Sequence, residues 1–153
     1  MPGVSSEPSP NIERLSAELA NLGFVRLGYL EVSSHNIRDK EKWVFASGDH
    51  EMSLTISVPP GVTVPIVLIA SFFADGALLE TRSPVGVGIR LPDYRANVSP
   101  LKLVLTIELH KRHLAQFRSQ HGVPLPVAAI EDYRREALRA DTLHRDQFFQ
   151  TYN

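Results

Sequence analysis

Cysteine is absent from all 153 residues of the chain. Without a thiol, the protein cannot form a disulfide bond, a cysteine-type zinc finger, an iron–sulfur cluster or a thiolate nucleophile. Proteins without disulfides are typical of reducing compartments. This absence favours a cytoplasmic location.

Long apolar runs are also missing. The longest apolar segment, residues 65–70, has the length of a strand, whereas a membrane-spanning helix needs about 18 or more apolar residues. Residues 1–10 lack the basic and apolar parts of a secretory signal. We therefore expect a cytoplasmic protein with no membrane span.

Neither sign of charge is in excess. Sixteen basic residues face 17 acidic residues, and the formal net charge is −1. Proteins that bind nucleic acid usually carry a clearly basic face, and basic residues do not interleave with aromatic residues in this chain. We expect no nucleic-acid partner, although a local basic patch is compatible with this balance.

The composition that is present, 43% hydrophobic and 22% charged residues, is typical of a globular domain. At this length we expect one domain with a substantial core. Residues 1–10 are rich in proline and serine and predict a disordered tail. Residues 11–150 then form the single α+β domain.

The domain begins with an amphipathic helix over residues 11–22. Asn11 is a favourable N-cap, and Gly23 is a favourable C-cap in the left-handed conformation. Apolar residues recur three and four positions apart, as on one helical face: Ile12, Leu15, Leu19 and Leu22.

The middle of the chain predicts strands. An irregular strand covers residues 24–32, and a hairpin around Gly48 and Asp49 joins residues 43–47 to residues 52–58. The alternation in 53–58 predicts one face of that strand open to water. Asp75-Gly76 predicts a second hairpin over residues 64–82, with the type I′ turn in which both central residues have positive φ. A short strand is compatible with residues 85–91, and we interpret the rest of 83–99 as a loop.

Residues 100–120 fit both a strand and a helix, because Leu101 to Leu109 alternate with period two. We choose one helix ending at Gly122, since no turn residue interrupts the segment and Ser99 and Pro100 suit the N-cap and first helical position. The helical stripe consists of Leu103, Ile107, His110, Leu114 and Phe117.

A final amphipathic helix is predicted over residues 127–149. Its apolar positions are Val127, Ile130, Tyr133, Ala137, Leu138 and Ala140. The expected fold is therefore α+β: an N-terminal helix, an antiparallel meander of about five strands, then two C-terminal helices packed on one face of the sheet. Strands joined by hairpins argue against a Rossmann-like nucleotide site.

The segment from Arg82 to Lys102 is the best candidate for binding a small anion. It carries several basic residues and leads to a helix N-terminus, where free N–H groups favour anions. The alternative interpretation is a solvated loop without a site. The candidate ligand-binding residues are Arg82, Arg90, Arg95 and Ser99.

No motif predicts catalysis. His110 and His113 share a helical face but lack the acidic residue of a metal-binding HExxH pattern, so we interpret His110 as a core histidine. Turn formation accounts for Asp75 without catalysis, and no serine lies in a nucleophile elbow. We expect no cofactor, no metal site and no catalytic residue, and we lean against an enzyme.

Tyr133, Phe148 and Phe149 on the last helix could pack on the domain or contact a partner. Our leading hypothesis is a non-catalytic binding or adaptor module that acts through protein–protein contacts, as a homodimer or small subunit. The alternative is a domain that binds a small anionic ligand, or a modest enzyme, with a pocket between sheet and helices.

Overall fold

The computed structural model describes residues 10–30, 41–58, 65–84, 86, 88–99 and 102–145. The predicted tail lies outside them except for Pro10, which is the first residue of helix α1 (Pro10–Asn21). Proline suits a first helical turn because the amide hydrogen it lacks has no helical partner there. Ile12 and Leu19 are buried, and Gly23 has a φ of +88° after the helix, as its C-cap role requires.

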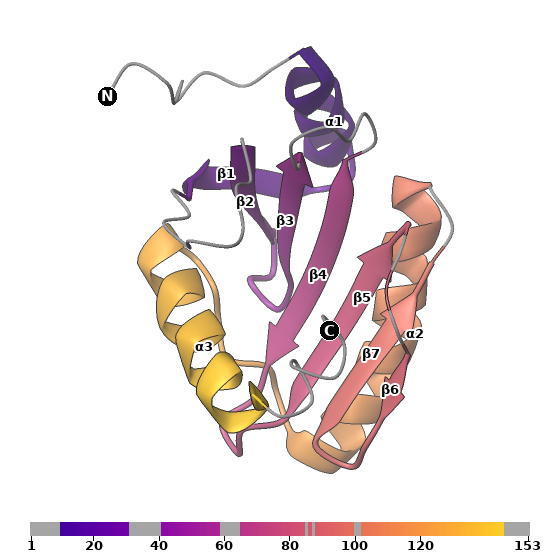
Figure 1. Ribbon diagram of the computed structural model, residues 1–153, viewed down its shortest axis with the longest axis vertical. Helices are drawn as coiled ribbons and strands as arrows, with labels where there is room; N and C mark the ends of the chain where they lie inside the picture. The colour runs from indigo at the N-terminus through magenta and orange to yellow at the C-terminus, as the bar shows by residue number, and fades with distance from the viewer. Residues whose placement is uncertain are drawn as a thin grey trace.

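The strands form one sheet in the order β1-β2-β3-β4-β5-β7-β6 (Figure 1). All neighbours are antiparallel except β5 and β7, which are parallel. The strands are β1 (Phe24–Tyr29), β2 (Glu41–Ser47), β3 (Ser53–Val58), β4 (Ile66–Phe72), β5 (Leu78–Ser83), β6 (Ile89–Arg90) and β7 (Tyr94–Val98). The α+β class is confirmed, but the described sheet has seven strands rather than about five.

The strand β7 occupies a segment that we expected to be a loop. Tyr94 and Ala96 are buried on one face of this strand, and its pairing with β5 extends from Leu78↔Tyr94 to Arg82↔Val98. Polar residues occupy the alternate positions, so local composition hides the strand. The parallel pairing is a long-range contact that local patterns do not report.

Both predicted hairpins are present. The β4–β5 turn is a three-residue loop, because the Gly76 amide donates to Phe73 O and the Phe73 amide donates to Ala77 O. Gly76 alone in this turn has positive φ, at +92°. The expected type I′ turn is therefore wrong, and the geometry is a tight turn followed by a glycine bulge.

Residues Leu103–His121 form helix α2, so the helical interpretation of this segment is confirmed. Its predicted apolar stripe is buried in full, together with Thr106. The N-terminus differs from prediction, since Lys102 is the N-cap and makes no side-chain cap hydrogen bond. Gly122 ends the helix at a φ of +88°.

The last helix, α3 (Ile130–Leu143), is shorter than predicted. Asp132 Oδ2 accepts hydrogen bonds from the amides of Ala128 and Ala129, both at 3.0 Å, and so fixes the start of the helix. Val127 is buried in the extended segment before it. Phe148 and Phe149 lie outside the described residues.

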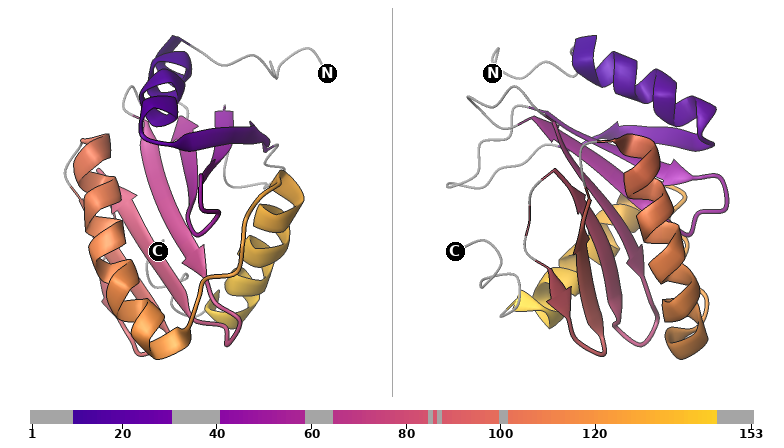
Figure 2. Two further views of the ribbon diagram at one scale, coloured as in Figure 1. Left: turned by 180° about the vertical axis from the view of Figure 1, so that it is seen from behind. Right: turned by 90° about the vertical axis from the view of Figure 1, so that its right-hand side faces the viewer.

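Helices α2 and α3 lie on opposite faces of the sheet, not on one face (Figure 2). Ser71 Oγ contacts His110 of α2, whereas the ring of Phe72 packs against Tyr133 of α3, and successive residues of a strand point to opposite faces. Each face therefore has its own apolar cluster, one with α1 and α2 and one with α3.

The predicted wet face of β3 is buried for the same reason. Ser53 and Thr55 are 1% and 2% exposed, and Ser53 Oγ donates to Ala70 O at 3.2 Å. Small hydroxyl side chains can be buried at little cost when they are hydrogen-bonded. All six residues of β5 are buried as well, so the sheet is covered on both sides.

Candidate ligand pocket

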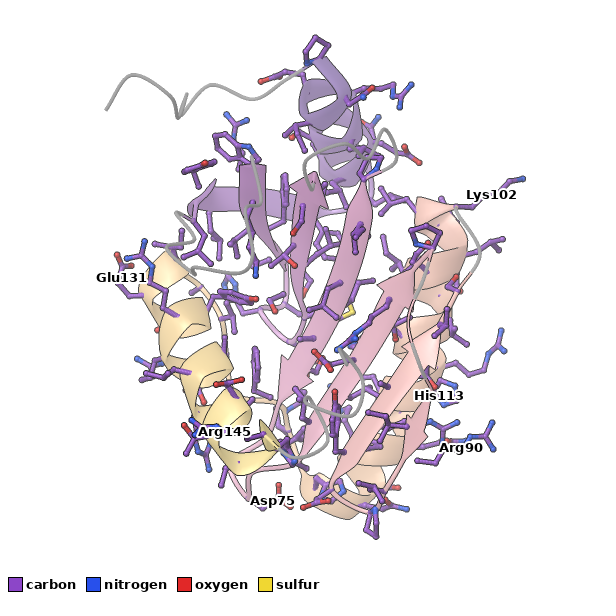
Figure 3. The ribbon with its side chains drawn as sticks, viewed as in Figure 1. Asp75, Arg90, Lys102, His113, Glu131 and Arg145 are labelled. Carbon is purple, nitrogen blue, oxygen red and sulfur yellow. The ribbon has the colours of Figure 1, made fainter. Side chains whose placement is uncertain are left out.

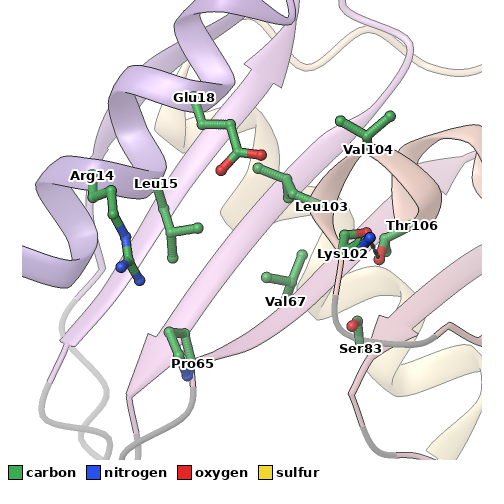
Figure 4. Close-up of a pocket in the computed structure, with 10 residues that line it drawn as sticks. All are labelled: Arg14, Leu15, Glu18, Pro65, Val67, Ser83, Lys102, Leu103, Val104 and Thr106. Carbon is green, nitrogen blue, oxygen red and sulfur yellow. Dashed lines mark hydrogen bonds between the residues drawn. The ribbon is translucent and has the colours of Figure 1, made fainter.

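A pocket of about 340 Å³ opens between α1 and the N-terminal turn of α2, over the sheet (Figure 4). Helices α1 and α2 cover the same face of the sheet but stand apart at this end (Figure 2). The pocket volume lies at the lower end of the roughly 300–1,000 Å³ typical of small-ligand sites. The lining residues are Arg14, Leu15, Glu18, Pro65, Val67, Ser83, Lys102, Leu103, Val104 and Thr106.

The floor and walls of the pocket are mainly apolar. Val67 on β4 and Leu103 on α2 are buried members of the core cluster, and the half-buried Leu15 packs against the same cluster from α1. A ligand bound here would therefore bury its apolar surface against these side chains. This burial is worth roughly 25 cal/mol for each Å² of apolar surface.

Two buried hydroxyl groups supply polar atoms at the bottom. Thr106 Oγ1 lies 3.0 Å from Lys102 O and 3.2 Å from Ser99 Oγ, and Ser83 is 2% exposed at the end of β5. Because Thr106 is one turn into α2, its hydroxyl is tied to the carbonyl of the N-cap residue. This hydroxyl therefore bonds within the first turn of α2, beside the pocket.

Charged residues surround the pocket mouth. Arg14 and Lys102 are basic and Glu18 is acidic, so the rim carries one excess positive charge. None of the three forms an ion pair within the described residues. The amide groups of the first turn of α2 add a partial positive charge, because the N-cap side chain does not cap them.

The four residues predicted to bind an anion do not form one site. Arg82 is 4% exposed and contacts Glu80 at 3.1 Å, on the sheet face that carries α3. The buried Ser99 donates its amide to Arg82 O and contacts Thr106 behind the pocket. Arg90 and Arg95 are direct neighbours across β6 and β7, away from the pocket.

His110 lies in the core, as the sequence suggested. Its Nε2 is 2.9 Å from Ser71 Oγ and its Nδ1 is 2.9 Å from Thr81 Oγ1. Ser71 donates its hydroxyl hydrogen to Glu51 O, so it must accept from Nε2–H, and Thr81 then donates to Nδ1. Complete burial lowers the pKa of His110 to about 3, so the ring is neutral.

Ser71 and His110 are the residue types of a catalytic serine–histidine pair, but their burial does not suit catalysis. Ser71 and His110 are both buried, at 1% and 0% exposure, so no substrate can reach them. Among the described residues, no group of three or more acidic or histidine side chains could hold a metal ion. No helix of the described segments is long and apolar enough to cross a membrane.

Of the three residues predicted to contact a partner, the structure describes only Tyr133. Tyr133 is 5% exposed and packs edge-on against Phe72, with 6.3 Å between ring centroids. Its ring therefore belongs to the core and cannot form a partner surface. Phe148 and Phe149 lie outside the described residues.

Sequence reasoning missed most of the pocket. Lys102 and the helix N-terminus were recognised as features that favour an anion, but Arg14, Leu15 and Glu18 were not connected with them. The available signal was that Arg14 and Glu18 flank the apolar stripe of α1 at a spacing of four. What brings them to Lys102 is the packing of α1 and α2 on one sheet face, which is a tertiary contact.

Comparisons of the chain with protein-family models, with curated proteins and with solved structures found no match. The function is therefore argued from the residues of the pocket.

Proposed function

We propose that the protein binds a small amphipathic anion, such as a medium-chain carboxylate, in the pocket between α1 and α2. The observation that carries the proposal is an apolar cavity of about 340 Å³ whose rim has one excess positive charge. The apolar part of the ligand would contact Leu15, Val67 and Leu103. Its charged group would lie at the rim, near Arg14 or Lys102.

Charge and shape select the ligand class. A monoanion neutralises the rim, whereas an alkyl amine of equal length would add to its positive charge. Ion pairs at an exposed rim contribute modestly to the binding free energy. The apolar chain of the ligand therefore supplies most of the affinity. We therefore expect affinity to increase with chain length until the cavity is full.

The test fills the pocket with a larger side chain at a position that tolerates it. Val104 lines the pocket and is 46% exposed, and the next residue, Leu105, is 48% exposed but does not line it. Val104→Trp and Leu105→Trp therefore place the same indole in the same helical turn. Circular dichroism checks that both variants fold.

Titration calorimetry with octanoate, decanoate and octylamine then gives the result. We expect wild type and Leu105→Trp to bind decanoate more tightly than octanoate, and Val104→Trp to bind neither. Octylamine should bind weakly or not at all. Equal binding by the two tryptophan variants would place the ligand elsewhere, and absence of carboxylate binding by wild type would refute the proposal.

The contribution of charge is tested separately. Arg14→Gln combined with Lys102→Gln should weaken carboxylate binding about tenfold, since each removed charge interaction is worth roughly 0.5–1 kcal/mol at an exposed site. Arg134→Gln on α3 removes an exposed arginine far from the pocket residues and should leave binding unchanged.

Self-association is the second candidate function. Leu138 and Leu143 are 68% and 54% exposed on α3, and apolar side chains on a helix surface can contact a second copy of the chain. Light scattering tests this directly. A dimer that Leu138→Gln converts to a monomer would support it, and a wild-type monomer at high concentration would refute it.

A further inference from the structure

A second group of basic side chains lies outside the pocket, where α2 passes beside β6 and β7. Arg90 and Arg95 stand directly opposite each other in the antiparallel β6–β7 pair. Side chains at such positions are about 4.5–5.5 Å apart at Cβ, and like charges there repel. This arrangement costs stability unless an anion compensates it.

The strand register places these two arginines on the α2 face of the sheet. Arg95 pairs with Leu79 of β5, and Leu79 belongs to the core cluster that contains the buried residues of α2. Arg90, opposite Arg95, shares that face. His113 lies one turn beyond His110, which contacts Thr81 two residues along β5 from Leu79. Figure 3 shows the side chains of His113 and Arg90 at the same edge of the molecule.

Arg95 is held in position by the strand that carries it. Its Nε donates to Asn97 Oδ1 at 3.1 Å, and Asn97 Nδ2 donates to Glu80 O at 3.4 Å. No other partner of Arg95 occurs within the described residues, so the two terminal nitrogens of its guanidinium stay available. A fixed guanidinium loses little side-chain entropy when it binds an oxyanion.

The pKa of His113 is sensitive to the positive charge at this surface. Burial and then the positive charge of Arg95, with smaller contributions from Arg112 and Arg90, lower the pKa of His113, while a hydrogen bond with Gln116 opposes them. The charged residues that lower this pKa are all arginines. Its Nδ1 is buried and has no hydrogen-bond partner.

The acidic residues nearest to these arginines in the sequence, Asp93 and Glu108, form no ion pair with them within the described residues. Arg90, Arg95 and Arg112 form no ion pair with any described residue. Glu108 is exposed one turn before Arg112 on α2, and it too is without an ion pair in the described part of the chain. The whole protein has a net charge of −1. The gathering of positive charge at this surface is therefore a local feature.

We propose that Arg90, Arg95, Arg112 and His113 form a binding site for a soluble ligand that carries two or more linked phosphate groups. Three guanidinium groups match the several negative charges of such a ligand, and arginine binds phosphate oxygens through paired hydrogen bonds. His113 lies beside these arginines, so a phosphate group bound to them would change its electrostatic environment. The ligand relieves the repulsion between Arg90 and Arg95.

This site is separate from the carboxylate pocket. His113 is eleven residues from Lys102 on α2, which corresponds to about 16 Å along a helix axis. None of the four residues lines the pocket. Failure of one proposal therefore leaves the other standing, and Val104→Trp should bind phosphate ligands normally.

The experiment titrates the full chain with inorganic pyrophosphate and tripolyphosphate by calorimetry. Wild type should bind both, more tightly at low salt. Arg90→Gln and Arg112→Gln should each weaken binding about tenfold, and both are exposed positions where glutamine does not threaten folding. Arg134→Gln, which removes one exposed arginine from α3, should bind as wild type does.

A site-specific readout comes from NMR of the histidine rings, with the His113 signal assigned from His113→Gln. Pyrophosphate should raise the pKa of His113 because it offsets the surrounding positive charge. Vesicles of phosphatidylcholine containing phosphatidylserine form the second arm of the test. Binding to vesicles but not to pyrophosphate, or equal pyrophosphate binding by wild type and Arg112→Gln, would overturn the proposal.

Discussion

Acidification should destabilise the fold chiefly through His110. Burial holds the pKa of this histidine at about 3 in the folded protein, compared with 6.5 for an unperturbed ring. Below pH 6.5 the unfolded chain binds a proton on His110, whereas the folded chain does not until pH about 3. The stability is therefore complete above pH 6.5 and decreases as the pH falls from 6.5 towards 3.

The magnitude follows from the size of this gap. Each pH unit inside the window costs about 1.4 kcal/mol, so lowering the pH from 7 to 4.5 should cost about 2–3 kcal/mol. The pKa of His113 is also lowered, first by burial, and its titration acts in the same direction. The variant His113→Gln removes that contribution from the measurement.

Urea unfolding at pH 7, 5.5 and 4.5 measures the effect, with Trp43 as a buried and unique tryptophan probe. In His110→Gln the decline over this range should largely disappear, although the variant is less stable at pH 7 because its contacts with Ser71 and Thr81 change. NMR of the wild-type ring should show no titration of His110 above pH 4.5. Parallel stability profiles for wild type and His110→Gln, or a ring that titrates near pH 6.5, would refute the reasoning.

Three further substitutions test single features of the fold by urea unfolding at pH 7. Gly76→Ala should cost about 1 kcal/mol because the φ of +92° is strained for alanine, and an unchanged midpoint would contradict the turn geometry. Glu80→Gln should cost about 3 kcal/mol, since it removes the carboxylate that contacts the buried Arg82 at 3.1 Å; a loss below about 1 kcal/mol would contradict that buried pair. Asp132→Ala should lower the urea midpoint through loss of the α3 cap, whereas Glu131→Ala at the exposed neighbouring position should lower it distinctly less.

Local patterns predicted the elements that depend on neighbouring residues. The apolar stripe of α2 and the glycines that end α1 and α2 are each determined within one or two turns of chain. The two hairpins also follow from local turn residues. Even the conflict between strand and helix at Leu101 to Leu109 was resolved by the continuity of the segment with a clear helix.

Long-range contacts account for what the sequence did not reveal. The strand β7 depends on its parallel partner β5, and the burial of Ser53 and Thr55 depends on cover for the second sheet face. The placement of α3 opposite α2 cannot be inferred from amphipathicity, because either face of the sheet can accept an apolar helix.

The candidate sites show the same division. Arg90 and Arg95 were identified from local sequence, but the register that pairs them and the helix that brings His113 beside them were not. The pocket joins Arg14 on α1 to Lys102 on α2, 88 positions later in the chain. No spacing rule connects residues so far apart.

Mapping of decanoate binding by NMR of the backbone amides tests the central claim most directly. A ligand in the pocket should shift the amide signals of Leu15, Val67 and Leu103 together, because all three residues line the pocket from different elements. The same titration of Val104→Trp should leave these signals unchanged. Shifts confined to α3, or no shifts at saturating decanoate, would contradict the account.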